Sequence, residues 1–223
     1  MMDWSAFALS IQLALGTLAV LLPVGLLVGR WLARTPFKGR TWLEAAILLP
    51  LVLPPTVMGY YLLVALGGAS PVGQWLQNSF GISLTFNFTG LLLASVVFNI
   101  PFMIQPIQRA FDSIPVNLNE AAQVSGLSTW AIFTKVELPL AWPGILSAIV
   151  LTFVHTLGEF GVVLMIGGSI PGETRTLAIS IYDSVQSFDL NAANTMSLAL
   201  LVFSLVAVAS SLWLSGRRKR PVQ

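Results

Sequence analysis

Long apolar runs recur along this chain and are separated by short polar connectors. A helix needs about 20 consecutive apolar residues to cross the hydrocarbon core of a bilayer. The runs that meet this length extend from Phe7 to Gly29, Trp42 to Leu66, Phe86 to Ile107, Leu140 to Gly167 and Ala193 to Leu214. The pattern therefore predicts an all-α integral membrane protein with five transmembrane helices, in which residues 1–223 form a single transmembrane domain.

One further apolar run leaves a second interpretation open. The stretch from Leu177 to Val185 is apolar but too short to cross, so we expect an outer surface helix or a re-entrant piece. Six spans are the alternative. The chain begins Met-Met-Asp without a basic leader and continues into an apolar run longer than a signal-peptide core, so the first helix is expected to be retained.

Composition supports the membrane assignment and removes several kinds of chemistry. The chain is 56% hydrophobic and 9% charged, which is too little polar surface to cover a soluble protein of this size. It has no cysteine and one histidine, His155, so disulfides, thiolate sites and sites with several histidines are excluded. We expect no metal or cofactor in this chain. A net charge of only +2 does not indicate a nucleic-acid binder.

The basic residues predict the orientation of the spans, because cytoplasmic connectors retain Lys and Arg. The connectors and the tail assigned to the cytoplasm contain Arg30, Arg34, Lys38, Arg40, Arg109, Lys135, Arg217, Arg218, Lys219 and Arg220. Only Arg175 falls in a connector assigned to the outside. The N-terminus is therefore expected outside and the C-terminus in the cytoplasm.

The connector at about 108–139 is the longest of those assigned to the cytoplasm, and its residues favour short helices. Asn119 is expected to cap a helix that carries Glu120 in its first turn, and Gly126 is suited to a left-handed stop. The small side chains of Ala121 and Ala122 would leave one side of this helix without protruding groups. The groove of another protein could then approach the helix backbone closely. An amphipathic connector resting on the membrane surface is the alternative.

A second short helix is expected after Gly126. Ser128 can cap it, and it should end at Leu138-Pro139, where the chain returns to the bilayer.

The second span contains Pro50, Pro54 and Pro55, and each proline removes a backbone donor where no water can replace it. This span is expected to be kinked or interrupted. A translocation pathway beside Pro54 and Pro55 and a purely structural kink are both compatible with the pattern.

Ionisable residues lie near the end of the fourth span. His155 and Glu159 are four residues apart, which places them on one helix face. Such groups often mark a pathway, and we take Thr156, Gly158 and Glu159 as candidate gate residues. By helix length Glu159 should lie near the outer surface, where pairing with Arg175 or a capping role is as well supported as substrate contact. Gly158 and Gly161 are expected to allow close helix packing.

Residues in the long connector follow a recognisable spacing. Glu120-Ala121-Ala122 is followed after three residues by Gly126, and after nine more by Val136, any residue, and Leu138-Pro139. This run resembles the EAA loop of bacterial ABC importer permeases, in which Ile is usual where Val136 stands. The segments at 49–55, 157–161 and 170–176 are similar to molybdate transport permeases. Sulfate and thiosulfate permeases share much of this pattern but are usually longer.

The resemblance implies a type I ABC importer permease-like bundle in the bacterial inner membrane. A homodimer of this chain would form the pathway, and an outer binding protein would deliver molybdate, with tungstate not separable and sulfate as the alternative. A pair of ATPase subunits would grip residues 120–126, with Val136, Leu138 and Pro139 also in the coupling region. The chain lacks the phosphate loop ending in Gly-Lys-Ser/Thr, so ATP and Mg would be used by the partner.

Two other classes of function fit the residues less well. An intramembrane hydrolase needs a nucleophile and a base on facing helices, and His155 is the only imidazole. A secondary transporter driven by an ion gradient usually contains internal repeats, and none is evident.

Overall fold

The computed structural model describes residues 2–217, and this part of the chain contains helices and no strand. The helices are α1 (Trp4–Arg34), α2 (Arg40–Val52), α3 (Pro55–Leu66), α4 (Pro71–Phe80), α5 (Phe88–Asp112), α6 (Val116–Val124), α7 (Thr129–Ile132), the π-helical turn η1 (Phe133–Glu137), α8 (Leu138–Leu157), α9 (Gly161–Gly167), α10 (Leu177–Gln186) and α11 (Leu190–Arg217). The all-α prediction is confirmed. Arg218, Lys219 and Arg220 lie outside the described residues.

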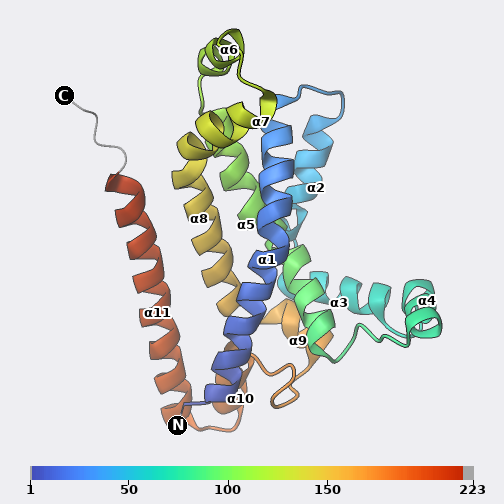
Figure 1. Cartoon of the computed structure of the whole chain (residues 1–223). Coiled ribbons are helices and arrows are strands. Elements are labelled where there is room, and N and C mark those ends of the chain that lie inside the picture. The colour runs from blue at the N-terminus through green and yellow to red at the C-terminus, as the bar shows by residue number, and fades with distance from the viewer. Residues whose placement is uncertain (1, 218–223) are drawn as a thin grey trace.

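Three long helices, α1, α5 and α8, pack together and form the centre of the bundle (Figure 1). One apolar cluster lies between them and includes Leu21, Met103, Ile107 and Ile145, all almost fully buried. The helix α11 runs beside α8 at the edge of the bundle, and its lower end contacts α10 (Figure 1). The short α6 projects beyond the bundle at the opposite end from α10.

Four helical segments of the described chain are long and apolar enough to cross a membrane: α1, α5, Thr129–Leu157 and α11. The pair α2 and α3 adds a fifth if it is counted as one span, but its two halves are bent by 108°. Five spans are therefore supported, with the second one broken. The run at Leu177 forms α10, which has only 10 residues, and no sixth span is found in residues 2–217.

The break in the second span lies at the prolines. The helix α2 ends at Val52, Leu53 and Pro54 are extended, and Pro55 opens α3 as its first residue. A proline is tolerated there because the first residues of a helix have no intrahelical acceptor for their N–H groups. The predicted interruption is confirmed, whereas a single straight helix over residues 42–66 does not form.

The fourth predicted span is also divided. The helix α8 ends at Leu157 and α9 begins at Gly161, so residues 140–167 do not form one helix. At its other end, α7, η1 and α8 follow one another from Thr129 without a gap. The predicted helix end at Leu138-Pro139 is wrong, because Pro139 occupies the first turn of α8 and Leu138 N–H donates to Phe133 O across the π-helical turn.

Candidate functional site

The region with the expected coupling residues lies at the end of the bundle where α1 ends, at the top of Figure 1. We call it the basic end, because Arg30 and Arg34 in the last turns of α1 and Arg109 near the end of α5 are located there. The helices α6 and α7 and the turn η1 form its connector.

The first helix of this connector begins earlier than predicted. Pro115, with φ −58° and ψ 136°, precedes α6, and Val116 is its first residue. Proline has a fixed φ that suits the start of a helix and has no N–H that needs an acceptor. Asn119 therefore lies inside α6 and does not cap it; its Nδ2 instead donates to Glu137 Oε1 at 3.0 Å.

The end of α6 is as predicted. Gly126 has φ +79°, and Leu127 N–H donates to Ala122 O at 3.1 Å across the turn. A Cβ added at Gly126 would meet no atom within 4 Å, so the backbone conformation alone requires glycine. Ser128 then caps α7, because its Oγ accepts from Ala131 N–H at 3.2 Å. Both predictions for this turn are confirmed.

The exposed surface of α6 differs from the expected one. Glu120 and Ala121 are exposed, and Val124 is 90% exposed. Ala122 is only 8% exposed because it faces the rest of this chain, so the prediction of a low exposed flank is wrong for this residue. A partner protein would meet Glu120, Ala121 and Val124.

The remaining residues of the expected coupling motif lie on the continuous segment that leads into α8. Val136 is half-buried in η1, and Leu138 packs against the apolar cluster between α1, α5 and α8. Pro139 is exposed. These residues therefore connect the basic end to the bundle core and do not extend the surface of α6.

One buried carboxylate at the basic end was missed by the sequence analysis. Glu137 is 1% exposed, and its carboxylate accepts from Arg30 Nε at 2.5 Å, from Arg34 Nε at 3.1 Å and from Asn119 Nδ2. A buried charge needs such pairing to offset its lost hydration. These contacts join α1, α6 and η1. The available signal was two arginines four residues apart and one acid among the apolar residues of the connector.

A second buried carboxylate lies in the interior of the bundle. Glu159 is 4% exposed, and its Oε2 accepts from Ser95 Oγ at 2.9 Å and from Asn99 Nδ2 at 3.2 Å. Ser95 also accepts from Thr17 Oγ1 of α1 at 3.1 Å. Ser95 and Asn99 lie well inside α5, so the predicted position near the outer surface is wrong. The polar groups of α5 draw the side chain into the bundle.

The expected pairing of Glu159 with Arg175 does not form. Arg175 Nε lies 3.6 Å from Asp183 Oδ2, in a separate contact beside α10. His155 does not pair with Glu159 directly; its Nδ1 lies 3.0 Å from Asn99 Oδ1, and its ring stacks on Phe102 at 3.8 Å. Because α8 ends at Leu157, the two residues do not share a helix face, and Asn99 bridges them.

The two glycines beside Glu159 have different roles. A Cβ at Gly161 would lie 2.9 Å from Pro55 Cβ, so this glycine allows α9 to approach α3 closely, as predicted. The prediction is wrong for Gly158, which caps α8 and would have no neighbour of its new Cβ closer than 3.8 Å. Pro54 precedes α3, and buried Thr156 donates to Thr152 O at 2.8 Å. Of the candidate gate residues, Pro55 is therefore the one that packs against Gly161.

The polar groups of the described chain do not form a metal site. No cluster of three Asp, Glu or His suited to a metal ion is found in residues 2–217. The projecting helix α6 is instead followed by the continuous helical segment Thr129–Leu157. This segment ends inside the bundle at the break between α8 and α9. Such an arrangement can transmit a displacement of α6 to the bundle interior.

Comparison of the sequence with known proteins gives consistent matches. Residues 22–220 match the family described as "Binding-protein-dependent transport system inner membrane component". The chain is 43% identical over 217 residues to the molybdenum transport system permease protein ModB of Azotobacter vinelandii, covering 97% of this chain and 96% of that one. It is 34% identical to the sulfate transport system permease protein CysT of Escherichia coli, covering 89% of this chain and 71% of that one.

Solved structures share the fold. A bacterial ABC transporter involved in the import of the acidic polysaccharide alginate superposes with a TM-score of 0.78 at 19% identity, covering 97% of this chain and 79% of that chain. The MetNI methionine ABC transporter superposes with a TM-score of 0.69, also at 19% identity, covering 97% of this chain and 94% of that chain. The type I ABC importer permease-like bundle is thus confirmed.

Proposed function

The chain belongs to the family of binding-protein-dependent transport system inner membrane components, and from this premise we propose that it is the permease subunit of an ATP-driven importer for molybdate. The observation that carries the proposal is the similarity to a molybdenum permease over nearly the full length of both chains. Tungstate is a tetrahedral oxyanion like molybdate, and we include it as a second substrate.

The proposed assembly contains two copies of this chain, which form the pathway between them, and two ATPase subunits that use ATP and Mg. An outer binding protein delivers the oxyanion. The basic end faces the cytoplasm, with the N-terminus outside and the C-terminus inside the bacterial inner membrane. Arg30 and Arg34 in the last turns of α1, Lys38 in the connector and Arg40 at the start of α2 support this orientation.

Cysteine labelling tests the orientation, because the chain has no cysteine of its own. Single cysteines at Thr35 in the connector after α1 and at Ser70 before α4 should react with an impermeant thiol reagent from opposite sides. We expect Ser70→Cys to be labelled in intact cells and Thr35→Cys only after the cells are opened. The reverse result would contradict the proposed orientation.

Coupling to the ATPase is assigned to the exposed surface of α6. A partner that grips Glu120 and Ala121 can pull on Glu137 through Asn119, and Glu137 is tied to α1 by two arginines. The segment from Thr129 to Leu157 leads from this point to the break beside Glu159. Displacement of α6 would thus reach Pro54, Pro55, Thr156, Gly158 and Glu159, the proposed gate.

Bulk on the exposed side of α6 tests this assignment. Ala121→Trp should abolish transport and ATPase association, because the added ring occupies the surface that the partner must approach. Asn78→Trp is the control, since Asn78 is exposed on α4, another short helix that lies away from the basic end. Equal transport by both variants and the parent would contradict a docking role for α6.

Glu159 is proposed to support the gate and not to bind the substrate. An isolated carboxylate repels an arriving oxyanion, and this one already accepts two hydrogen bonds from α5. Its place at the break between α8 and α9 suits a residue that ties this break to α5.

Uptake of radiolabelled molybdate tests the substrate. Proteoliposomes should contain this chain, the ATPase and the binding protein encoded with it, and unlabelled tungstate and sulfate should be added as competitors. We expect tungstate to compete and sulfate to have little effect. Uptake of sulfate with no uptake of molybdate would favour the second candidate, a sulfate permease, which the similarity to CysT proteins supports more weakly.

A further inference from the structure

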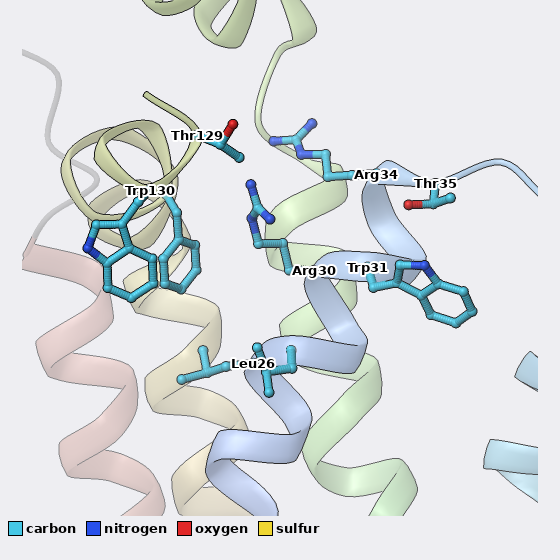
Figure 2. Close-up of a pocket in the computed structure, with 9 residues that line it drawn as sticks. Leu26, Arg30, Trp31, Arg34, Thr35, Thr129 and Trp130 are labelled. Atoms are coloured by element: carbon cyan, nitrogen blue, oxygen red, sulfur yellow. The ribbon is translucent and has the colours of Figure 1, made fainter. Parts of the chain in front are cut away.

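A pocket of about 420 Å³ lies at the basic end between the last turns of α1 and the start of α7 (Figure 2). Its inner part is apolar and includes Leu26 and Phe133. Arg30, Arg34 and Thr129 line the other part, and in Figure 2 the two guanidinium groups extend toward Thr129. The pocket thus combines a cationic part with an apolar part.

The cationic part of the pocket contains hydrogen-bond donors that are not used within the chain. Arg30 and Arg34 each use Nε to bind Glu137, which leaves their terminal guanidinium nitrogens for another acceptor. Arg34 Nη2 is buried and has no hydrogen-bond partner in the described part of the chain. Glu137 and Glu120 line a neighbouring cleft that shares Arg30, Arg34 and Thr129 with this pocket, and no acidic residue is among those that line the pocket itself. Of the two carboxylates only Glu137 is ion-paired with the guanidinium groups, so these contacts leave one positive charge in excess.

The apolar part continues along a helix that is long and apolar enough to span the membrane. Leu27 is 72% exposed, and Val24 and Val20 are exposed on the same face of α1 at helical spacing. Trp130 and Trp31, both exposed, flank the pocket. Exposed tryptophans prefer the level of the lipid headgroups, so the pocket lies where headgroup and acyl chain meet.

We propose that this pocket binds an anionic phospholipid of the adjacent leaflet, such as phosphatidylglycerol. The phosphate accepts hydrogen bonds from the terminal nitrogens of Arg30 and Arg34 and from the Thr129 hydroxyl. One acyl chain lies against Leu26 and Leu27 and continues along α1. An anionic headgroup is favoured over a zwitterionic one because the excess positive charge repels an ammonium group. The inference does not depend on the transported substrate.

Lipid retention measured by native mass spectrometry tests the proposal. The assembled transporter is released from nanodiscs that contain equal amounts of phosphatidylglycerol and phosphatidylcholine. We expect phosphatidylglycerol to be retained about tenfold more than phosphatidylcholine, which corresponds to about 1.4 kcal/mol of repulsion between the pocket and the ammonium group that only phosphatidylcholine has.

The decisive variant is Thr129→Glu, which places a carboxylate beside both guanidinium groups. Thr129 is the first residue of α7, where Glu is favoured by the helix dipole, so the fold should persist. Selective retention should be lost. Asn117→Glu is the matched control, because it adds the same charge in the first turn of α6 away from the pocket, and it should retain the lipid.

Three outcomes would overturn the proposal. They are equal retention of the two lipids by the parent, undiminished retention by Thr129→Glu, and the absence of any retained lipid because a second copy or the ATPase covers the pocket in the complex.

Discussion

The carboxylates of two buried glutamates are stabilised by different kinds of partner in this molecule. Glu137 at the basic end is paired with two arginines and an asparagine, and these partners come from α1 and α6. Glu159 inside the bundle accepts from Ser95 and Asn99, both neutral and both on α5, and its Oε1 has no partner in the described chain. The first carboxylate is held by charge, and the second by neutral hydrogen bonds alone.

The difference indicates which region is fixed and which can rearrange. Separating Glu137 from its arginines would leave charges of both signs unpaired, whereas separating Glu159 from α5 breaks neutral donor bonds that a water or another side chain could replace. We infer that the basic end moves as one unit and that the break beside Glu159 is where the bundle changes shape.

The largest effect is expected at Glu137. Glu137→Ala leaves two partly buried guanidinium groups without their acceptor and should lower the free energy of unfolding by about 3–5 kcal/mol. Unfolding of the purified chain in detergent measures this. Glu173→Ala is the control, because Glu173 is exposed, and its effect should stay within about 0.5 kcal/mol. Similar values for both variants would show that Glu137 does not hold the basic end.

A substitution that disturbs the packing beside Glu159 should give the next largest loss of stability. Gly161→Ala places a methyl group 2.9 Å from Pro55 Cβ and should cost about 1–3 kcal/mol, because α3 and α9 must separate. Gly158→Ala adds the same atom where the nearest neighbour lies 3.8 Å away. Thermal unfolding of both variants compares them. If Gly158→Ala were the more damaging, close packing would not be what determines the shape of the break.

A backbone change tests the basic end without altering its ion pairs. Gly126→Val forces a β-branched residue into a left-handed conformation and should cost about 1–2 kcal/mol. Gly39→Val creates the same strain before α2, since Gly39 has φ +97° and also has open space around it. If α6 couples the ATPase to the bundle, only Gly126→Val should abolish transport and ATPase association. Equal loss in both variants would indicate strain alone.

The smallest change in stability is expected for Glu159→Gln. The amide oxygen can still accept from Ser95 and Asn99, so the cost should be below about 1 kcal/mol, whereas Glu137→Gln, which loses two ion pairs, should cost more. Transport by Glu159→Gln should fall without a change in the ratio of molybdate to sulfate uptake. A clear shift in that ratio would make Glu159 a substrate ligand.

Features that depend on neighbouring residues could be predicted from the sequence. The left-handed stop at Gly126, the Ser128 cap and the interruption at Pro54 each follow from the backbone chemistry of a few adjacent residues. The long apolar runs predicted the spans for the same reason. The ends of the spans were predicted less well. At Leu138-Pro139, for example, the π-helical turn η1 leads directly into α8, so the proline does not end the helix.

The partners of the two glutamates could not be predicted in this way. Glu137 meets Arg30 across more than one hundred residues of sequence, and Glu159 meets Ser95 across 64. Ser95 and Asn99 are isolated polar residues in an apolar run, so the pattern of the run does not show which helix they face. The length of the fourth span predicted that Glu159 lies near the outer surface of the membrane. Only the three-dimensional packing shows that its side chain points into the bundle, toward α5.

The bend between α2 and α3 has a consequence for how α2 is held in the membrane. The helix α2 has 13 residues, and at about 1.5 Å per residue it is about 20 Å long, shorter than the roughly 30 Å hydrocarbon layer. By itself it is too short to form a stable span. Since α2 packs against α5, we expect its retention in the membrane to depend on α5. A chain truncated before α5 should therefore be extracted from the membrane more easily than the full chain.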